Sequence, residues 1–202
     1  MPTAYADRTL DAYAAYASKA SENWGRLRPP KFLRRFARGL RPGARVLDYG
    51  CGIGVELAWL RSRGFAAEGI DGTRAFVREA RRRSPGAAIQ LCRFEDARLA
   101  PAAYDGIWCQ AALIHVPPAE MRRQLRMLRS ALSPGGWLAL TLAWGRTRAY
   151  TRRDWIPGRY FAAYTKPQAL AMLRGWRVLS ASVISHDGRQ GRWIQILAQA
   201  GR

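Results

Sequence analysis

Cysteine and histidine are scarce in this chain, which has three cysteines and two histidines among its 202 residues. The cysteines are Cys51, Cys92 and Cys109; they are odd in number and form no C-x-x-C pair. With only His115 and His186 beside them, a zinc site is not expected, and we predict that the protein binds no metal. The cysteines lie in or next to expected strands, where reduced thiols serve as small packing residues.

Long apolar runs are also missing. No run approaches the roughly 18 residues that a membrane-spanning helix needs. The first twenty residues have no apolar signal-peptide core, and their helical pattern carries few of the basic residues of a transit peptide. Hydrophobic residues make up 49% and charged residues 24%, so the composition is globular, and the length suits one domain with a full core. These features predict a cytoplasmic protein with no membrane partner.

Acidic side chains are few, 14 against 34 basic ones, so that the formal net charge is +20. Lysine contributes only Lys19, Lys31 and Lys166, and all the other basic residues are arginines. A positive field of this size attracts nucleic acids, anionic surfaces and anionic small molecules without selecting among them. An arginine-rich solvated surface that reflects a GC-rich genome would give the same charge, and both interpretations stay open.

The hydrophobic pattern changes once, near Gly43. Before it, helical spacing runs from about Asp7 to Ala20, and a second helical stretch opens after Pro29 and Pro30 and stops at Gly39. After it, short apolar strands alternate with amphipathic helices. The expected strands are Arg45–Tyr49, Ala66–Asp71, Ala88–Arg93, Tyr104–Gln110, Gly136–Ala143, Trp176–Ser185 and Arg192–Gln199. The expected helices are Val55–Arg63, Arg74–Arg83, Pro118–Leu132 and Pro167–Arg174.

This alternation predicts an α/β fold, a Rossmann-like doubly wound sheet of seven strands that is mostly parallel. The last two strands are joined by "HDGRQGR", which leaves no room for a helix and therefore predicts an antiparallel hairpin. The residues Ser133–Gly136 are expected to form a turn between a helix and the next strand. We expect residues 1–42 to form an N-terminal helical cap and residues 43–202 to form one compact domain.

The segment "VLDYGCGIG" places Gly50, Gly52 and Gly54 directly after the first strand. In a doubly wound sheet, ligands bind in the crevice at this position, and glycines let a ligand approach the backbone closely. The spacing is G-x-G-x-G, whereas dinucleotide-binding loops have G-x-G-x-x-G. Asp48 and Glu56 flank the glycines. The loop is therefore acidic and poorly suited to a phosphate.

Further acidic residues follow the next two strands. Asp71 ends the second strand, where a carboxylate can accept hydrogen bonds from both hydroxyls of a ribose. Glu95 and Asp96 follow the third strand, on the side where an adenine would lie. Taken alone, Asp71 could instead cap the helix that begins near Thr73. The three acidic features together, at one edge of one sheet, indicate a nucleoside ligand.

These motifs, with "YDGIWCQAALIHVP" and "LRSALSPGGWLAL", resemble the successive motifs of the class I S-adenosylmethionine (SAM) dependent methyltransferases over about Ala44–Ala143. The stretches "GRYF" and "DGRQGRWIQILA" are similar to small, uncharacterised bacterial methyltransferase-domain proteins. SAM carries an ammonium and a sulfonium but no phosphate, so that an acidic loop suits it. The resemblance implies a methyltransferase that binds SAM and releases S-adenosylhomocysteine (SAH).

The resemblance also assigns residues to the parts of SAM. The glycines would pass the methionine moiety and Asp48 would orient its amino group. Asp71 would bind the ribose, Asp96 or Glu95 the adenine amine, and Gln110 with Ala111 would line the far wall. The residues expected to contact SAM are Asp48, Gly50, Cys51, Gly52, Gly54, Asp71, Gly72, Glu95, Asp96, Ala97, Gln110 and Ala111.

Methyl transfer from a sulfonium requires no nucleophilic residue, because the donor is already activated. Alignment of donor and acceptor alone can supply up to ~7–11 kcal/mol in ideal cases. A general base adds ~10²–10⁴-fold for a hydroxyl or ammonium acceptor. His115, just after the fourth strand, is the histidine placed for that role, and the competing interpretation is a structural histidine.

The acceptor site is expected between the N-terminal helices and the segment after the fifth strand. The candidate acceptor residues are Tyr13, Tyr16, Trp24, Arg146, Arg159, Tyr160 and Tyr164. The first three either close over SAM as a lid or simply pack in a core. Another candidate group, which would brace the site from the last hairpin, is Arg189, Arg192 and Trp193.

An arginine-rich loop distinguishes this chain from the similar bacterial proteins, which carry an acidic glycine-rich loop near the position of Gly145. The residues here are Arg146, Arg148, Arg152 and Arg153. Forked guanidinium groups favour an anionic acceptor such as a carboxylate or phosphate. A solvated loop is the alternative for each arginine taken singly.

Three functions stay open. The favoured one is transfer of a methyl group to a small anionic or aromatic acceptor by in-line displacement. The second is an RNA methyltransferase that docks through its basic surface, although no separate RNA-binding module is visible and the basic residues spread over nearly every helix. The third is a SAM-fold binding protein that has lost catalysis. The methylated atom and the oligomeric state are left open.

Overall fold

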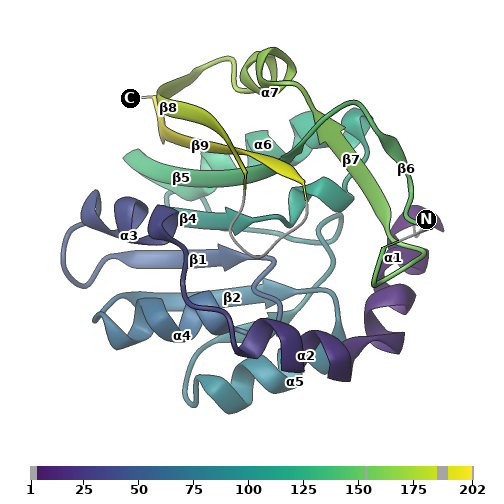
Figure 1. Cartoon of the computed structure of the whole chain (residues 1–202). Helices are drawn as coiled ribbons and strands as arrows, with labels where there is room; N and C mark the ends of the chain where they lie inside the picture. Colours follow the sequence, from purple (N-terminus) through teal and green to yellow (C-terminus); the bar gives the residue numbers. More distant parts are fainter. Residues whose placement is uncertain (1–3, 153, 186–190, 202) are drawn as a thin grey trace.

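A mixed β-sheet forms the middle layer of the computed structural model, which describes residues 4–152, 154–185 and 191–201 (Figure 1). Its parallel strands follow the order β3-β2-β1-β4-β5. β9 continues the sheet antiparallel to β5, and β8 pairs antiparallel with β9. The strands are β1 (Arg45–Tyr49), β2 (Ala66–Asp71), β3 (Ile89–Leu91), β4 (Tyr104–Gln110), β5 (Leu132–Trp144), β6 (Arg148–Tyr150), β7 (Tyr160–Tyr164), β8 (Trp176–Ser185) and β9 (Arg192–Ala200).

The predicted doubly wound sheet with its C-terminal antiparallel hairpin is confirmed, but the predicted count of seven strands is wrong. The described residues contain two further strands, β6 and β7, which pair antiparallel with each other. β7 also pairs with β5, through Ala143 and Ala163. Because Ala143 already pairs with Trp193 of β9 on one edge, β7 must lie on the other edge, beyond the end of β4. Both strands are short and arginine- or tyrosine-rich, and so gave no clear apolar alternation.

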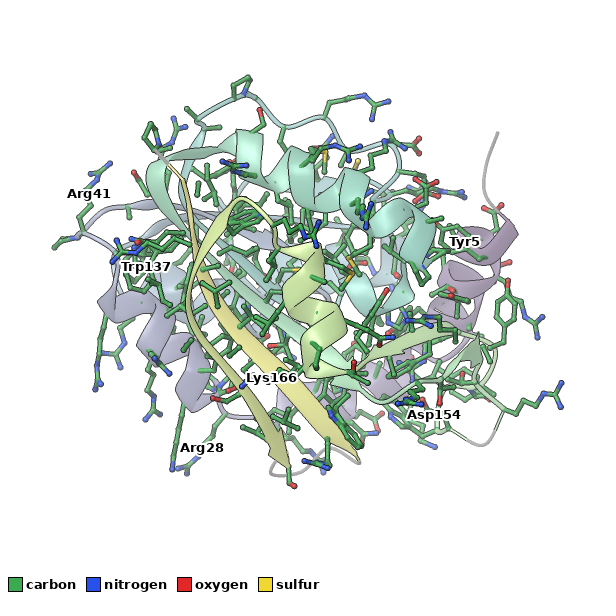
Figure 2. All side chains as sticks on the ribbon, turned by 90° about the horizontal axis from the view of Figure 1, so that it is seen from above. Tyr5, Arg28, Arg41, Trp137, Asp154 and Lys166 are labelled. Carbon is green, nitrogen blue, oxygen red and sulfur yellow. The ribbon has the colours of Figure 1, made fainter. Side chains whose placement is uncertain are left out.

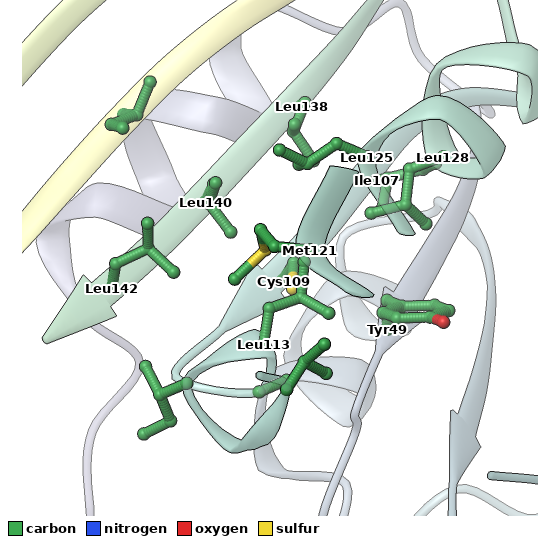
Figure 3. Packing of buried hydrophobic residues seen from close by; sticks show 14 of the residues in the cluster. Tyr49, Ile107, Cys109, Leu113, Met121, Leu125, Leu128, Leu138, Leu140 and Leu142 are labelled. Atoms are coloured by element: carbon green, nitrogen blue, oxygen red, sulfur yellow. The ribbon is translucent and has the colours of Figure 1, made fainter. Parts of the chain in front are cut away.

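Helices cover both faces of the sheet and bury alternate side chains of each strand. The first face, packed against α3, α4 and α5, carries Val46 and Trp108 in its hydrophobic cluster. The second face is covered by α6 and α7 and buries Leu47, Ile107 and Leu140. Figure 3 shows Ile107 and Leu140 in this cluster beside Leu125 of α6. The helices are α1 (Ala4–Ala15), α2 (Ala17–Gly25), α3 (Lys31–Arg38), α4 (Val55–Ser62), α5 (Arg74–Arg83), the one-turn 3₁₀ helix η1 (Leu113–His115), α6 (Pro118–Ala131) and α7 (Lys166–Met172).

Two local predictions differ from the structure. The first helical stretch breaks at Tyr16 into α1 and α2. The residues Ser133–Gly136 do not form a turn outside the strand, because β5 already begins at Leu132 and pairs there with Tyr104 of β4. The register shifts before the next pair, and Gly135 adopts a φ of +76°. The SPGG segment is therefore an irregularity within β5.

The N-terminal helices lie across the carboxyl ends of the strands (Figure 1). α1 packs on β7 and α2 packs on α5, so that together they bridge the two halves of the sheet. A separate small hydrophobic cluster holds them, centred on Ala20, Ile53, Phe76 and Ile156. α3, by contrast, packs directly on the sheet, where a Cβ at Gly106 would lie 2.8 Å from Phe36. Division of the chain at residue 42 stays a prediction.

Over the described ranges, no helix is both long and apolar enough to cross a membrane. Cys51 and Cys109 are buried and Cys92 is half-buried, and all three are free thiols.

A buried side-chain pair joins β1 to α6. Tyr49 Oη donates to Gln124 Oε1 at 2.6 Å, and Gln124 Nε2 donates to the Phe94 carbonyl at 3.0 Å. We predict that Tyr49→Phe lowers the free energy of unfolding by about 1–3 kcal/mol, because it leaves the Gln124 oxygen buried without a donor. Urea titration of both proteins measures this loss. The double variant Tyr49→Phe/Gln124→Leu should lose less than the sum of the two single variants; simple additivity would contradict this coupling.

Candidate functional site

A cavity of about 1050 Å³ opens at the carboxyl ends of β1, β2 and β4. α1, α2 and the segment around β6 and β7 complete its walls. Most of the residues predicted from the sequence meet here. The predicted residues that line the cavity are Tyr13, Trp24, Asp48, Gly50, Cys51, Gly52, Asp71, Gly72, Glu95, Gln110, Ala111, His115 and Arg159. The candidate brace Trp193 lines it too.

Other predicted SAM residues lie elsewhere. Gly54 begins α4 beside α5, where an added Cβ would lie 2.8 Å from the Cβ of Ala80. Asp96 is exposed and lines a smaller neighbouring cavity. Ala97 is buried in the hydrophobic core. Packing accounts for Gly54 and Ala97.

The predicted acceptor residues also divide. Tyr16 packs in the cluster under α1 and α2, and Arg146 is exposed; neither lines the cavity. Tyr164 is buried in the core, with the Arg148 guanidinium 5.4 Å from its ring centroid. Tyr160 contacts the rings of Tyr5 and Tyr150. Arg192 stacks on Trp144 at 4.1 Å. Arg153 and Arg189 lie outside the described residues.

Two of the three glycines are required by close packing, and one is not. The backbone of Gly50 has a φ of +83°, and an added Cβ would lie 2.4 Å from the Cβ of Ala112. At Gly52, with a φ of +53°, an added Cβ would meet nothing within 4 Å. Its missing side chain therefore leaves open space beside the cavity, where a ligand can reach the backbone.

Asp71 braces this loop. Its Oδ2 accepts the Gly52 N–H at 2.9 Å, and its Oδ1 accepts the Thr73 N–H at 2.7 Å. Burial raises the pKa of Asp71, and these two backbone hydrogen bonds oppose the rise. The alternative cap role is partly realised, because Asp71 holds the turn into α5 although Thr73 is the N-cap residue. A carboxylate has about four lone-pair sites, so that Asp71 can still accept a hydrogen bond from a ligand.

Asp48 is a buried acidic residue of the site with one oxygen left without a hydrogen-bond partner among the described residues. The residue is 2% exposed, and the oxygen is Oδ2. Burial raises the pKa of Asp48 well above its usual range, and the nearby carboxylates of Glu56 and Asp71 raise it further. Arg93, a cation in the wall, is paired with Asp7 of α1 at 2.5 Å. This corner of the cavity therefore suits a cationic ligand.

His115 forms hydrogen bonds through both ring nitrogens. Nδ1 lies 2.7 Å from the Tyr160 carbonyl oxygen, and Nε2 lies 2.6 Å from Tyr13 Oη. Because a carbonyl only accepts, Nδ1 carries the proton, and Nε2 of the neutral ring accepts from the Tyr13 hydroxyl. Burial and the positive charge of Arg159 lower the pKa of His115 to about 3. The imidazole is neutral at pH 7.

Arg159 is buried in the cavity wall and is held by three groups. Its Nη1 donates to Tyr13 Oη at 2.9 Å, and its Nε donates to the Ile156 carbonyl at 3.1 Å. Its Nη2 forms an ion pair with Asp154. The guanidinium is therefore neutralised by the protein itself.

Aromatic rings line the part of the cavity under α1 and α2. Tyr13 and Trp24 each lie edge-on to Phe76, with ring centroids 5.4 Å apart. Trp24 lies edge-on to Trp155 at 5.6 Å. Sequence reasoning did not identify Phe76, Phe94, Asp154 or Trp155 as site residues. Phe76 sits on the apolar face of α5 and looks like a core residue, whereas "RDWIPGRYF" carries an aromatic–acid–arginine pattern that could have pointed to Asp154 and Trp155.

Comparison with known proteins gives a family for this fold and site. The family described as "Methyltransferase domain" matches residues 16–200. The ubiquinone biosynthesis O-methyltransferase of Xanthomonas campestris is 33% identical over 143 residues, which are 65% of this chain and 59% of that protein. The chain thus spans less than two thirds of the length of this relative.

Solved structures agree in fold. The 1,6-didemethyltoxoflavin-N1-methyltransferase of Burkholderia thailandensis, solved with 1,6-didemethyltoxoflavin and SAH, is 19% identical with a TM-score of 0.79, covering 100% of this chain and 91% of that one. The magnesium protoporphyrin IX methyltransferase of Synechocystis, solved with SAM, is 19% identical with a TM-score of 0.73 and full coverage of both chains (100% and 100%). With the family match over most of its length, the chain belongs to the methyltransferase-domain family of class I, SAM-dependent enzymes.

Proposed function

We propose that this protein transfers a methyl group from SAM to a hydroxyl oxygen of a small aromatic acceptor. The observation that carries the proposal is the buried Asp48 oxygen without a partner, at the end of β1 in the same cavity as an aromatic wall. The part of the cavity around Asp48 matches a cationic ligand, and the aromatic wall matches a flat apolar ligand. Oxygen as the methylated atom is supported by the name of the Xanthomonas relative, an O-methyltransferase.

The residues of the acidic corner fit SAM. Asp48 would pair with the amino group of its methionine moiety, and the open backbone at Gly52 would let that moiety pass. Asp71 would accept the ribose hydroxyls through its remaining lone pairs, while Glu95, Gln110 and Ala111 would border the adenine. When bound, SAM supplies a methyl group activated by the sulfonium.

The other part of the cavity favours an aromatic acceptor over an anionic one. Trp24, Phe76 and Trp155 offer ring faces and edges, which bind flat ligands well. Arg159 carries a charge that Asp154 already balances, and Arg146 does not line the cavity. Arg152 is exposed in the cavity wall and would meet an acidic substituent of the acceptor.

The chain contributes by positioning and by excluding water. α1 and α2 lie over the strand ends (Figure 1). Tyr13 and Trp24 line the cavity. An acceptor held between these helices and the sheet would be fixed close to the donor, which is the main source of acceleration in such a transfer. The helices must open for entry and release, and we propose this lid role for residues of α1 and α2.

Docking of RNA is less well supported. Basic side chains project from much of the periphery, with Arg28 and Arg41 pointing outward far from Tyr5 of α1 (Figure 2). The aromatic part of the cavity lies beneath α1 and α2, which a folded RNA would have to displace. A spread positive field without a groove attracts nucleic acid only nonspecifically.

The proposal is tested with methyl-labelled SAM and cell extract, separated after incubation into RNA, protein and small-molecule fractions. We expect label in the small-molecule fraction, and a loss of at least tenfold with Asp48→Asn. Asp48→Asn is the better control than Asp71→Ala, because Asp71 also holds the loop through Gly52 and Thr73. Label that RNase removes would overturn the proposal in favour of an RNA acceptor.

Asp48 also predicts a pH dependence of SAH binding. In the free protein its pKa is raised, and a bound ammonium would lower it, so that binding expels a proton. SAH affinity should therefore rise with pH above the usual aspartate range, with proton release measurable by calorimetry in buffers of different ionisation enthalpy. Asp48→Asn should weaken binding and abolish this dependence.

The raised pKa of Asp48 also predicts a pH dependence of stability. Because a raised folded-state pKa makes ionised Asp48 destabilising as the pH rises, Asp48→Asn without a ligand should have a higher melting temperature than the wild type at pH 8. The difference should be smaller at pH 5.

Gly52 and Gly54 predict different effects of the same substitution, because Gly52 borders the cavity and Gly54 packs against α5. A residue with a Cβ in the left-handed conformation costs roughly 1–2 kcal/mol. Gly54→Ala should lower the free energy of unfolding by more than this, because its Cβ would also clash with Ala80. Gly52→Ala bears only that backbone cost but places a methyl group beside the cavity. We expect the weaker SAH binding in Gly52→Ala and the lower melting temperature in Gly54→Ala, by calorimetry and thermal melts. The reverse order would show that Gly52 does not face the ligand.

A further inference from the structure

The sequence predicted His115 as a general base, with a structural histidine as the alternative, and the hydrogen bonds around its ring bear on this choice. Both ring nitrogens are already bonded within the protein, Nδ1 to the Tyr160 carbonyl and Nε2 to the Tyr13 hydroxyl. An acceptor in the cavity therefore meets Tyr13 before it meets an unoccupied nitrogen of His115.

Tyr13 Oη has one remaining place for a hydrogen bond. It donates its proton to His115 Nε2 and accepts from Arg159 Nη1 at 2.9 Å. A phenol oxygen has two lone pairs, so that the second can accept the hydroxyl proton of an acceptor. Arg159 is held in place by Asp154 and by the Ile156 carbonyl, and Tyr13 is held by the rings of Trp24 and Phe76. The oxygen is therefore fixed at the cavity wall.

We propose that Tyr13 is the catalytic acid–base residue and that His115 is a positioning residue, which takes up the proton that Tyr13 passes on. The inference rests on the proposed function. As the acceptor oxygen bonds to the methyl carbon, its proton moves to Tyr13 Oη and the Tyr13 proton moves to His115 Nε2. The sulfur–carbon bond breaks, and its electron pair stays on sulfur. The positive charge of the sulfonium thus ends on the imidazolium, and the extra proton later leaves to solvent.

The charges around this chain of groups suit a proton that is held only briefly. Arg159, on the segment before β7, faces both Tyr13 and His115; it lowers the pKa of His115 and opposes the burial that raises the pKa of Tyr13. Asp71 from β2 and Asp154 beside Arg159 raise the pKa of Tyr13. His115 is therefore neutral before the reaction, so that its Nε2 lone pair can receive the Tyr13 proton, and the lowered pKa of His115 makes it release that proton readily afterwards.

The relay has a signature that needs no acceptor. In full-length protein with ¹⁵N-labelled histidine, NMR should show His115 as the neutral Nδ1–H form at pH 7, assigned by comparison with His186→Gln. Tyr13→Phe removes the donor to Nε2, and the Nε2 resonance should shift while Nδ1 changes little. A protonated ring, or the Nε2–H form, would overturn the relay.

Activity separates a catalytic role from mere docking of α1. The rate is followed as label passing from methyl-labelled SAM into the small-molecule fraction of cell extract. Tyr13→Phe, which keeps the ring packing, should lower the rate ~10²–10⁴-fold while SAH affinity stays within threefold. His115→Gln should lower it less, with activity partly restored at higher pH. Tyr16→Phe, which removes a hydroxyl outside the cavity, is the matched control and should behave like the wild type.

The outcomes separate the two proposals. Unchanged turnover and pH profile in Tyr13→Phe, with label still entering small molecules, would overturn the role of Tyr13 and leave the proposed function standing. Label that the wild type places only in RNA would overturn the proposed function, and the Tyr13→Phe rate on that RNA would then decide the relay.

Discussion

Pairing of β1 with parallel strands on both edges is the constraint on which the site depends. Asp48 lies in register with Gly69 of β2 and Trp108 of β4, and it is buried, with 2% of its surface exposed. The same pairing gathers the ends of three strands at one edge of the sheet. The loop from Gly50 to Gly54 and the turn after Asp71 then face each other and are tied by the Gly52–Asp71 hydrogen bond.

The acidic corner works against the stability of the free protein. A buried carboxylate beside two others keeps a high free energy until a cation arrives. In the part of the chain that the structure describes, two cations of the cavity wall are already paired, Arg93 with Asp7 and Arg159 with Asp154. Local instability that a ligand relieves is typical of binding sites, and we propose that here it favours a positively charged ligand in a protein whose net charge is strongly positive.

The N-terminal helices and the β6–β7 segment form the second half of the site, and polar contacts join them across the cavity. Thr9 Oγ1 accepts the Tyr160 N–H at 3.0 Å, and Tyr13 contacts both His115 and Arg159. Under the proposed mechanism, closure of α1 would assemble the proton-accepting groups as it covers the cavity. The proposed lid closure and chemistry would then be linked through Tyr13, because an open lid would leave His115 without this partner.

Local sequence determined the alternating strands and helices, the glycine loop and the acidic strand ends, because periodicity and turn chemistry act between neighbouring residues. The topology predicted from these elements placed Asp48, Gly52 and Asp71 at one edge of the sheet. Only tertiary structure decided that Gly54 is a packing glycine, that β6 and β7 extend the sheet, and that Tyr13 occupies the nitrogen of His115. Those outcomes depend on contacts between residues that are far apart in the sequence; Tyr13 and His115, for example, are separated by 102 positions. No local pattern encodes contacts over such separations.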